Sequence, residues 1–198
     1  MRVGRWAVAA AAASMLPALA LASCRSRAAD RPVQRYGVGR AATRAEIAAM
    51  DVDVGPDGAG LPPGSGTAEQ GRTIYLARCA SCHGVRGEGL PPDYPRLVGR
   101  DAAAEGFPFA RDPRLERTIG NYWPYATTLF DYIRRAMPAT APGSLKDDEV
   151  YALTAWLLAA NRIVPDTAVM DSASLGAVRM PYRDRFVPDD RRGGREVR

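Results

Sequence analysis

Histidine, cysteine and lysine are scarce in this sequence. Its 198 residues contain one histidine, three cysteines and, at position 146, a single lysine. A structural zinc site needs four nitrogen or sulfur ligands, and one of the cysteines, Cys24, follows a leader segment. The ligand count therefore excludes a structural zinc site. No strand pattern persists beyond four residues, so we expect a helical chain rather than one rich in β-structure.

The overall composition is that of a folded protein with long irregular connections. Hydrophobic residues make up 46% of the chain and charged residues 25%, close to the globular average. The 19 glycines and 16 prolines indicate loops, and the length suits one modest domain with tails. The net charge of +5 includes Arg2 and Arg5 of the leader. The remainder is only mildly basic, and we expect no nucleic-acid partner.

The first 23 residues are typical of an export signal. Residues 1–5 are short and basic, residues 6–22 are almost entirely apolar, and the stretch Leu-Ala-Ser-Cys ends at Cys24. This stretch resembles the lipobox of bacterial lipoproteins, which implies that residues 1–23 are a lipoprotein signal peptide and that Cys24 carries a lipid anchor. The alternative is ordinary cleavage after Ala20 or Ala22. Either reading predicts a periplasmic protein, and the lipid would hold it on a membrane.

Composition divides the rest of the chain into three parts. Residues 24–66 are polar and contain a Gly/Pro-rich run, which predicts a tether and N-terminal arm with one short helix over residues 43–50. Residues 67–162 are predicted to form the folded domain. Residues 163–198 are polar and rich in arginine, and we expect them to form an extended C-terminal arm, on the surface or against a partner.

Three helices are expected within the domain. Thr67 is a candidate N-cap for the first, which runs to about Cys79. Glycines and prolines over residues 84–117 then predict a wrapping loop. A second helix is expected over residues 129–136, with Thr127 or Thr128 at its beginning, and a following proline ends it. The third begins at Ser144, as its N-cap, and its predicted buried stripe is Val150, Leu153, Leu157 and Leu158.

The residues with the clearest chemistry are consecutive. Cys79-Ala80-Ser81-Cys82-His83 has the Cys-x-x-Cys-His form of c-type haem attachment. Two thiols in one turn can bond the two vinyl groups of a haem, and the adjacent imidazole is then held against the iron. A thioredoxin-like redox pair is the alternative, but it needs a βαβ setting and no strand precedes this motif. The sequence therefore predicts one covalent haem c.

The second axial ligand must come from a different residue type, because His83 is the only histidine. Met137 is the best candidate, since it lies between two predicted helices and directly before Pro138, and histidine with methionine is the ligand pair of cytochromes c. The other methionines outside the leader are Met50, Met170 and Met180. With both axial positions filled, the iron has no vacancy for a substrate, which predicts an electron carrier and not an enzyme. Without Met137 as ligand, a haem enzyme or sensor remains possible.

Several polar and aromatic residues are candidates for contacts with the edge of a haem. Tyr122, Trp123 and Tyr125 lie in a predicted loop and combine apolar rings with hydrogen-bond donors. Arg100 could neutralise a propionate of the haem, and Arg96 is a further candidate for this role.

These features together resemble a class I cytochrome c. The resemblance rests on an N-terminal helix with Gly71 and Tyr75, the Cys-x-x-Cys-His motif, the later Met-Pro pair and a C-terminal helix with Trp156, and it covers about residues 67–161. It implies a small all-α domain around one covalent haem, with extended N- and C-terminal arms here. It also implies that the first and last helices cross, with Gly71 and Tyr75 against Trp156.

A narrower resemblance extends over about residues 36–180. The stretches LPPGSG at 61–66, TIGNYWPYATTLFDYI at 118–133, RAMP at 135–138 and APGSL at 141–145 are similar to the cytochrome subunits of bacterial sulfite and sulfane dehydrogenases. The resemblance implies a partner subunit with a molybdenum cofactor, which oxidises the sulfur compound, and a downstream cytochrome or oxidase. Some relatives carry two haems, whereas this chain has one motif, and it has a longer stretch over 101–117.

Two functions are therefore open besides the haem enzyme or sensor. The first is the electron-accepting partner of a periplasmic sulfite-type molybdenum dehydrogenase. The second is a general membrane-anchored cytochrome c that serves another dehydrogenase or an oxidase.

Overall fold

The computed structural model describes residues 36–100 and 107–187. The predicted signal peptide of residues 1–23, and Cys24 with its predicted lipid, lie outside the described residues. The chain divides into two units, Met1–Thr43 and Arg44–Arg198. The described residues of the first unit, 36–43, contain no helix or strand, so every described element belongs to the second unit.

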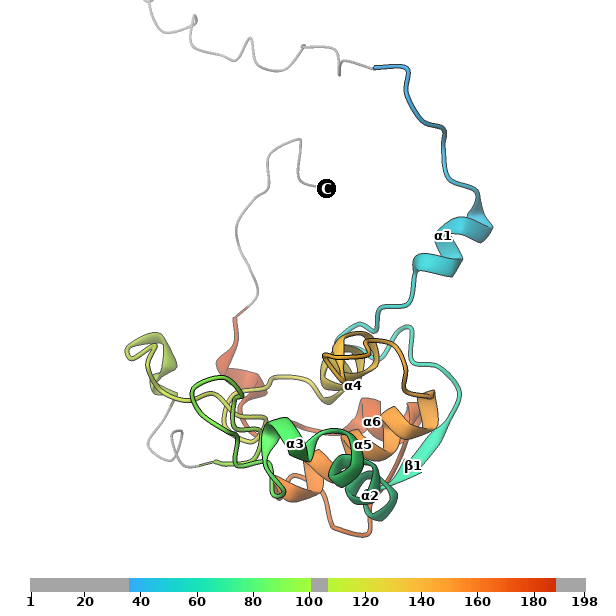
Figure 1. Cartoon of the computed structure of the whole chain (residues 1–198). Coiled ribbons are helices and arrows are strands. Elements are labelled where there is room, and N and C mark those ends of the chain that lie inside the picture. Colours follow the sequence, from blue (N-terminus) through green and yellow to red (C-terminus); the bar gives the residue numbers. More distant parts are fainter. Residues whose placement is uncertain (1–35, 101–106, 188–198) are drawn as a thin grey trace, which may run out of the picture. The chain divides into compact units, whose positions relative to one another are not determined.

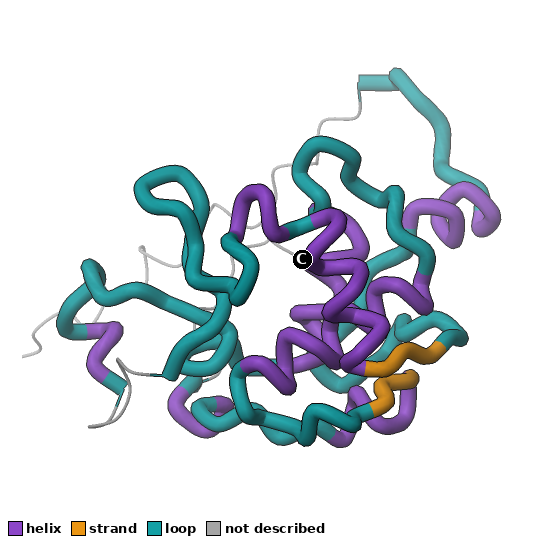
Figure 2. Tube along the Cα trace, turned by 60° about the horizontal axis from the view of Figure 1, so that its bottom comes forward, coloured by secondary structure: helices purple, strands orange, loops and turns teal. Residues whose placement is uncertain are grey.

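The second unit consists mainly of helices and loops (Figure 1). In chain order its elements are α1 (Arg44–Met50), β1 (Ser65–Thr67), α2 (Ala68–Arg78), α3 (Ala80–His83), the 3-10 helix η2 (Pro108–Ala110), α4 (Ala126–Ala136), α5 (Asp147–Ala160), β2 (Val169–Asp171), α6 (Ser172–Ala177) and the 3-10 helix η3 (Arg183–Arg185). Helices gather on one side, and loops make up most of the other (Figure 2). The predicted all-α fold is confirmed, with one two-stranded sheet that the sequence did not predict.

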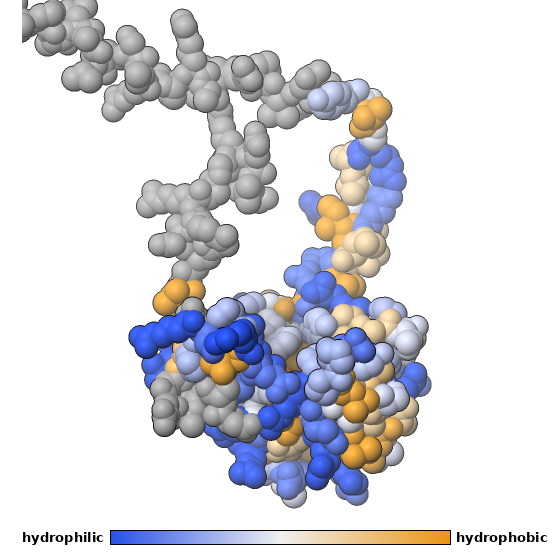
Figure 3. Space-filling model, turned by 60° about the vertical axis from the view of Figure 1, so that its left-hand side comes forward, coloured by the Kyte–Doolittle hydropathy of each residue, from blue (hydrophilic) through white to orange (hydrophobic). Residues whose placement is uncertain are grey.

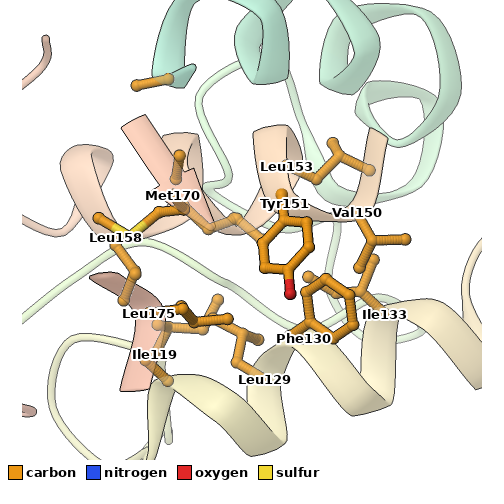
Figure 4. Close-up of a cluster of buried hydrophobic side chains, with 14 of the residues drawn as sticks. Ile119, Leu129, Phe130, Ile133, Val150, Tyr151, Leu153, Leu158, Met170 and Leu175 are labelled. Carbon is orange, nitrogen blue, oxygen red and sulfur yellow. The ribbon is translucent and has the colours of Figure 1, made fainter. Parts of the chain in front are cut away.

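Helix α5 lies at the centre of the hydrophobic core. The four residues of its predicted stripe are buried, and so are Tyr151, Ala152, Thr154, Ala155 and Ala159. The helix is covered on several sides because α2, α4 and β1 all contact it. Figure 4 shows Val150, Tyr151 and Leu153 of α5 together with Phe130 and Ile133 of α4. A helix buried this widely positions the other two long helices around it.

The start of α5 differs from the prediction. Lys146, not Ser144, is the N-cap residue, and the first helical residue is Asp147. The backbone N–H of Lys146 donates a hydrogen bond to Oε2 of Glu149 at 2.8 Å. A glutamate three residues after the N-cap thus satisfies this N–H, whichever residue type occupies the cap.

Helices α2 and α5 cross at Gly71. A Cβ atom at this position would overlap the carbonyl of Ala152 and would lie 2.8 Å from Cβ of Trp156, so only glycine fits. One turn later, the ring centroids of Tyr75 and Trp156 are 3.9 Å apart. The helix crossing expected from the class I resemblance is confirmed.

The boundaries of α2 and α4 follow from local contacts. Thr67 is the N-cap of α2, as predicted, and its Oγ1 accepts a hydrogen bond from the N–H of Gln70 at 3.1 Å. Helix α4 begins at Ala126, one residue before Thr127 and two before Thr128, the two predicted starts. Its first turn includes a hydrogen bond from the Thr128 hydroxyl to the Tyr125 carbonyl at 3.0 Å. The spacing of apolar residues, from which the helix was predicted, does not indicate such a bond.

The last part of the predicted N-terminal arm is packed onto the domain, which corrects the boundary at residue 67. Val54 is only 4% exposed, and its N–H donates a hydrogen bond to Oδ1 of Asp131 in α4 at 2.9 Å. The hydroxyl of Tyr151 donates to the carbonyl of Pro62 at 2.7 Å. Prolines and glycines mark this segment as irregular, but they do not reveal that its backbone groups bond to distant helices.

The predicted C-terminal arm also belongs in part to the core. Strand β2 pairs antiparallel with β1, and Met170 lies opposite Gly66. Met170, Leu175 and Met180 are 5%, 0% and 2% exposed. The domain therefore continues well past residue 162, which corrects the prediction of an extended arm over residues 163–198. These apolar residues are spaced singly among polar ones, so no helical or strand period indicated their burial.

Candidate haem site

The Cys-x-x-Cys-His motif forms a tight turn at the end of α2. The N–H groups of Cys82 and His83 both donate to the carbonyl of Cys79, at 3.1 and 2.9 Å. Residues 80–83 form the short helix α3. Cys79 and Cys82 are half-buried and form no disulfide with each other. Both thiols and the imidazole therefore belong to one helical turn, which is the arrangement that covalent haem attachment needs.

A backbone carbonyl orients the imidazole of His83. Its Nδ1 lies 3.0 Å from the carbonyl oxygen of Pro95. A carbonyl only accepts hydrogen bonds, so Nδ1 carries the proton and donates. In this tautomer the free lone pair is on Nε2, which can therefore bind a metal.

Hydrogen bonds hold the loop that follows His83 both near its start and at its end. The hydroxyl of Tyr75 donates to the carbonyl of Gly84 at 2.8 Å, and burial raises the pKa of Tyr75, so this donor keeps its proton. Leu97 and Val98 donate their N–H groups to the carbonyl of Gly87 at 2.8 and 3.0 Å. These bonds hold the wrapping loop, and with it the Pro95 carbonyl, in place.

A cavity of about 930 Å³ lies beside this motif. Its lining includes Cys79, Cys82, His83 and, from the end of α4, Met137. The volume falls at the upper end of the range of about 300–1,000 Å³ for cofactor and ligand sites. Most other lining residues are apolar or aromatic, among them Leu97, Ile119, Leu129, Ile133, Leu153 and Leu157. Two thiols, one imidazole and one thioether on one apolar cavity fit a covalent haem in donor set and in size.

Met137 reaches the cavity because α4 ends directly before it. Its backbone is extended, with φ −119° and ψ 148°, as Pro138 requires of the preceding residue. The other described methionines do not line the cavity: Met50 is 81% exposed, and Met170 and Met180 are buried in the core. The described chain therefore brings one thioether to the cavity. Its role as axial ligand stays a prediction.

The thiol of Cys79 differs from that of a redox-active cysteine pair. Burial raises its pKa to about 11, although Arg78 opposes the shift. Reactive thiols of thioredoxin-like proteins have pKa values below about 8.5, because only the thiolate is nucleophilic. A protonated Cys79 thiol does not suit disulfide exchange, which argues against the alternative reading of the motif.

The structure divides the predicted edge residues into two groups. Tyr122 and Trp123 line the cavity, and Nε1 of Trp123 donates to the hydroxyl of Thr128 at 3.1 Å. Tyr125 and Arg100 are not among the lining residues. The guanidinium of Arg183 lies 5.0 Å from the centre of the Tyr125 ring, and Nη1 of Arg100 lies 3.5 Å from the Arg162 carbonyl oxygen.

Two other arginines line the cavity, together with residues that sequence reasoning missed. Arg96, only a secondary candidate from the sequence, and Arg117 are both in the lining, and so are Tyr94, Tyr132 and Phe186. The sequence offered no signal that distinguishes Arg117 from the other arginines, because the chain has 27 basic residues. Positive charge is thus available to neutralise carboxylates of a bound cofactor.

An aromatic cluster holds Tyr122 and Arg117 at the cavity. Tyr122 is stacked on Phe107, with centroids 5.5 Å apart, and meets Phe109 and Phe186 edge-on at 5.0 and 5.3 Å. The guanidinium of Arg117 lies 5.1 Å from the centre of the Tyr122 ring. The cluster joins the stretch before residue 118 to the C-terminal segment, and Phe186 belongs to both the cluster and the cavity lining.

Within residues 36–100 and 107–187, no group of three or more His, Cys, Asp or Glu side chains could hold a metal ion by itself. In the same ranges, no helix has the length and apolar character needed to cross a membrane.

Known proteins resemble the chain in sequence and in structure. Residues 66–157 match the family model described as cytochrome C oxidase, cbb3-type, subunit III. A chain in the crystal structure of the sulfane dehydrogenase SoxCD from Paracoccus pantotrophus is similar, with 42% sequence identity and a TM-score of 0.67. That match covers 79% of this chain and 73% of the other. No curated protein matches.

Proposed function

The chain belongs to the class I c-type cytochromes, and we propose that it is the electron-accepting subunit of a periplasmic sulfite-type molybdenum dehydrogenase. Electron transfer through covalently bound haem c is the role of its family. The finer proposal is that one haem is held by Cys79, Cys82 and His83, with Met137 as second axial ligand. It also includes a molybdenum-cofactor partner as donor and a further cytochrome or an oxidase as acceptor.

One observation supports the electron-transfer role above all. The two thiols, the imidazole and a single thioether line the same cavity. A haem bound there supplies a one-electron couple between ferrous and ferric iron. If His83 and Met137 both bound the iron of such a haem, these two residues would exclude substrates from the metal. The half-buried Trp123 and the apolar lining limit the access of water, and Arg96 and Arg117 offer positive charge to the propionates.

The choice of donor rests on similarity. The SoxCD chain is 42% identical over most of both chains, and its structure is that of a sulfane dehydrogenase. Oxidation of one sulfite ion with water to sulfate releases two electrons and two protons. A carrier with one haem accepts these electrons one at a time, so two molecules of this chain are reduced for each sulfite oxidised.

The proposed location is the periplasmic face of a membrane, with the lipid on Cys24 as anchor. Two acyl chains or more are needed for stable anchoring, and a lipoprotein N-terminus supplies them. Mass spectrometry of the mature N-terminus tests this directly. A diacylated cysteine at position 24 supports the anchor, and an unmodified terminus at Leu21 or Ser23 would replace it with ordinary cleavage.

The donor is tested by mixing the haem-loaded protein with sulfite, with and without the molybdenum-cofactor subunit of the same organism. We expect reduction of the haem, followed by absorbance, only when that subunit is present. A two-to-one ratio of reduced cytochrome to sulfite consumed checks the electron balance. The absence of reduction with the partner present would favour the general electron carrier instead.

A further inference from the structure

Helix α1 buries none of its side chains against the described chain. Ile47 and Met50 are 56% and 81% exposed, and their spacing of three residues places them on one face of the helix. Isolated helices shorter than about 12–15 residues are marginal in water. A helix of 7 residues with an exposed apolar face therefore needs a further surface, beyond that of the described residues, to be stable. Figure 3 shows apolar residues along the exposed segment that precedes the domain.

The segment directly after α1 is anchored firmly to the domain. Nη1 of Arg134 donates to the carbonyl of Val52 at 3.0 Å, and the N–H of Val54 donates to Asp131 at 2.9 Å. Asp131 in turn accepts a hydrogen bond from Nε of Arg135 at 2.9 Å. The anchor begins two residues after the end of α1. Because the tether is so short, a protein that binds α1 is held close to the domain.

The extent of the structural match indicates which protein would bind α1. The match covers 79% of 198 residues, about 156, whereas the family model spans 92 residues and 41 residues follow it. Even if all 41 were matched, at least 23 matched residues must precede residue 66. The similarity to a chain of SoxCD thus extends into the arm, beyond the family domain. An arm that is shared with a chain of this enzyme, and whose helix α1 buries no side chain against the described domain, is suited to binding another subunit of the enzyme.

We propose that α1 docks through Ile47 and Met50 into an apolar groove of the molybdenum-cofactor subunit. This inference rests on the proposed function and deepens it by naming a surface that lies outside the haem cavity. A short helix that inserts apolar side chains into a groove is a common mode of recognition. In such interfaces a few central apolar side chains contribute most of the binding free energy.

Two other occupants are less favoured. A membrane surface is disfavoured because α1 and the residues after it are acidic on balance: Arg44 is outnumbered by Glu46, Asp51 and Asp53. A segment with net negative charge is repelled by anionic lipid headgroups. A second copy of this chain would have to offer a matching apolar groove, and the apolar cavity described above is lined by the haem-binding motif.

The test uses the haem-loaded full chain and the purified molybdenum-cofactor subunit. We expect the double variant Ile47→Asp, Met50→Asp to bind the subunit at least ~30-fold more weakly, the effect of losing a single interface hot spot. The matched control is Ala45→Asp, Ala49→Asp, which adds the same charge to the same exposed helix on its other face. Calorimetry measures affinity, and the haem spectrum and melting temperature, both unchanged, show that each variant is folded.

Each outcome decides between the possibilities. Equal binding by the wild type and the Ile47/Met50 variant overturns the docking proposal and leaves the proposed function standing. No binding by the wild type overturns both. If sedimentation shows that the wild type alone is a dimer and the variant a monomer, the occupant is a second copy. If only the variant loses binding to vesicles of phosphatidylethanolamine and phosphatidylglycerol, with Cys24→Ser in both chains, the occupant is a membrane.

Discussion

The two parts of the cavity lining are built in different ways. The attachment segment, residues 79–83, is a single helical turn whose groups are adjacent in the sequence. The assembled wall, which consists of Arg117, Tyr122, Trp123 and Met137, comes from the loop before α4 and from the residue after it. Backbone hydrogen bonds within one turn position the first. The second forms only when α4 packs against α5 and the aromatic cluster closes. Chemistry that needs adjacent groups is therefore local, and chemistry that needs groups across a cavity depends on the fold.

The largest effect is expected from the attachment segment itself. The double variant Cys79→Ser, Cys82→Ser removes both thiols, so no covalent haem can form. Haem staining after denaturing electrophoresis, with intact mass, is expected to show complete loss. Ser81→Ala, a change between the two cysteines, is expected to retain the haem. Haem that stays bound to the double variant after denaturation would contradict the assignment.

The assembled wall is tested by Met137→Ala. We expect the haem to remain covalent, while the sulfur-to-iron charge-transfer band of the ferric form disappears, the reduction potential falls and carbon monoxide binds rapidly. The cause is the loss of the thioether, which favours ferrous iron. Met170→Leu, in the core, is expected to keep the band. If Met137→Ala kept the band and Met170→Leu lost it, the thioether ligand would be Met170 and not the Met137 of the assembled wall.

The helix crossing behind both parts is tested by Gly71→Ala. The added methyl overlaps the carbonyl of Ala152, and overpacking of this kind costs about 1–3 kcal/mol. Denaturant unfolding followed by circular dichroism measures the free energy. Gly176→Ala, where no atom lies within 4 Å of the new Cβ, is expected to have no such cost. An unchanged free energy of unfolding in Gly71→Ala would mean that α2 can move away without loss, and that the crossing does not position the motif.

The smallest effect is expected from Arg117→Gln. Loss of a positive charge at the cavity makes the more positive ferric state easier to form, so the reduction potential should fall, by less than in Met137→Ala. Arg114→Gln removes the same charge from an exposed side chain that pairs with Asp112 at 2.9 Å, and we expect little change. Redox titration compares the two. Equal shifts of the reduction potential in the two variants would show that the haem responds to net charge alone. Arg117 would then have no particular role at the cavity.

The sequence by itself determined the attachment segment, the helical class and the crossing at Gly71. These depend on adjacent residues, on a 3.6-residue period or on a family pattern, all of which are visible along the chain. Thr67 was predictable as an N-cap because the residues that form this cap are also close together in the sequence. The start of α5 was not, because serine is a common N-cap residue and lysine is not, and the bond from the Lys146 N–H to Glu149 becomes visible only in the structure.

Only the tertiary structure decided which of the candidate side chains share the cavity. It placed Met137 there and Met170 and Met180 in the core, and it brought Arg117 to the cavity in place of Arg100. It also brought the ends of both predicted arms into the domain, through hydrogen bonds to Asp131 and the burial of single apolar residues. The physical reason is that side chains far apart in the sequence meet only after α2, α4 and α5 have packed, and no local period records that packing.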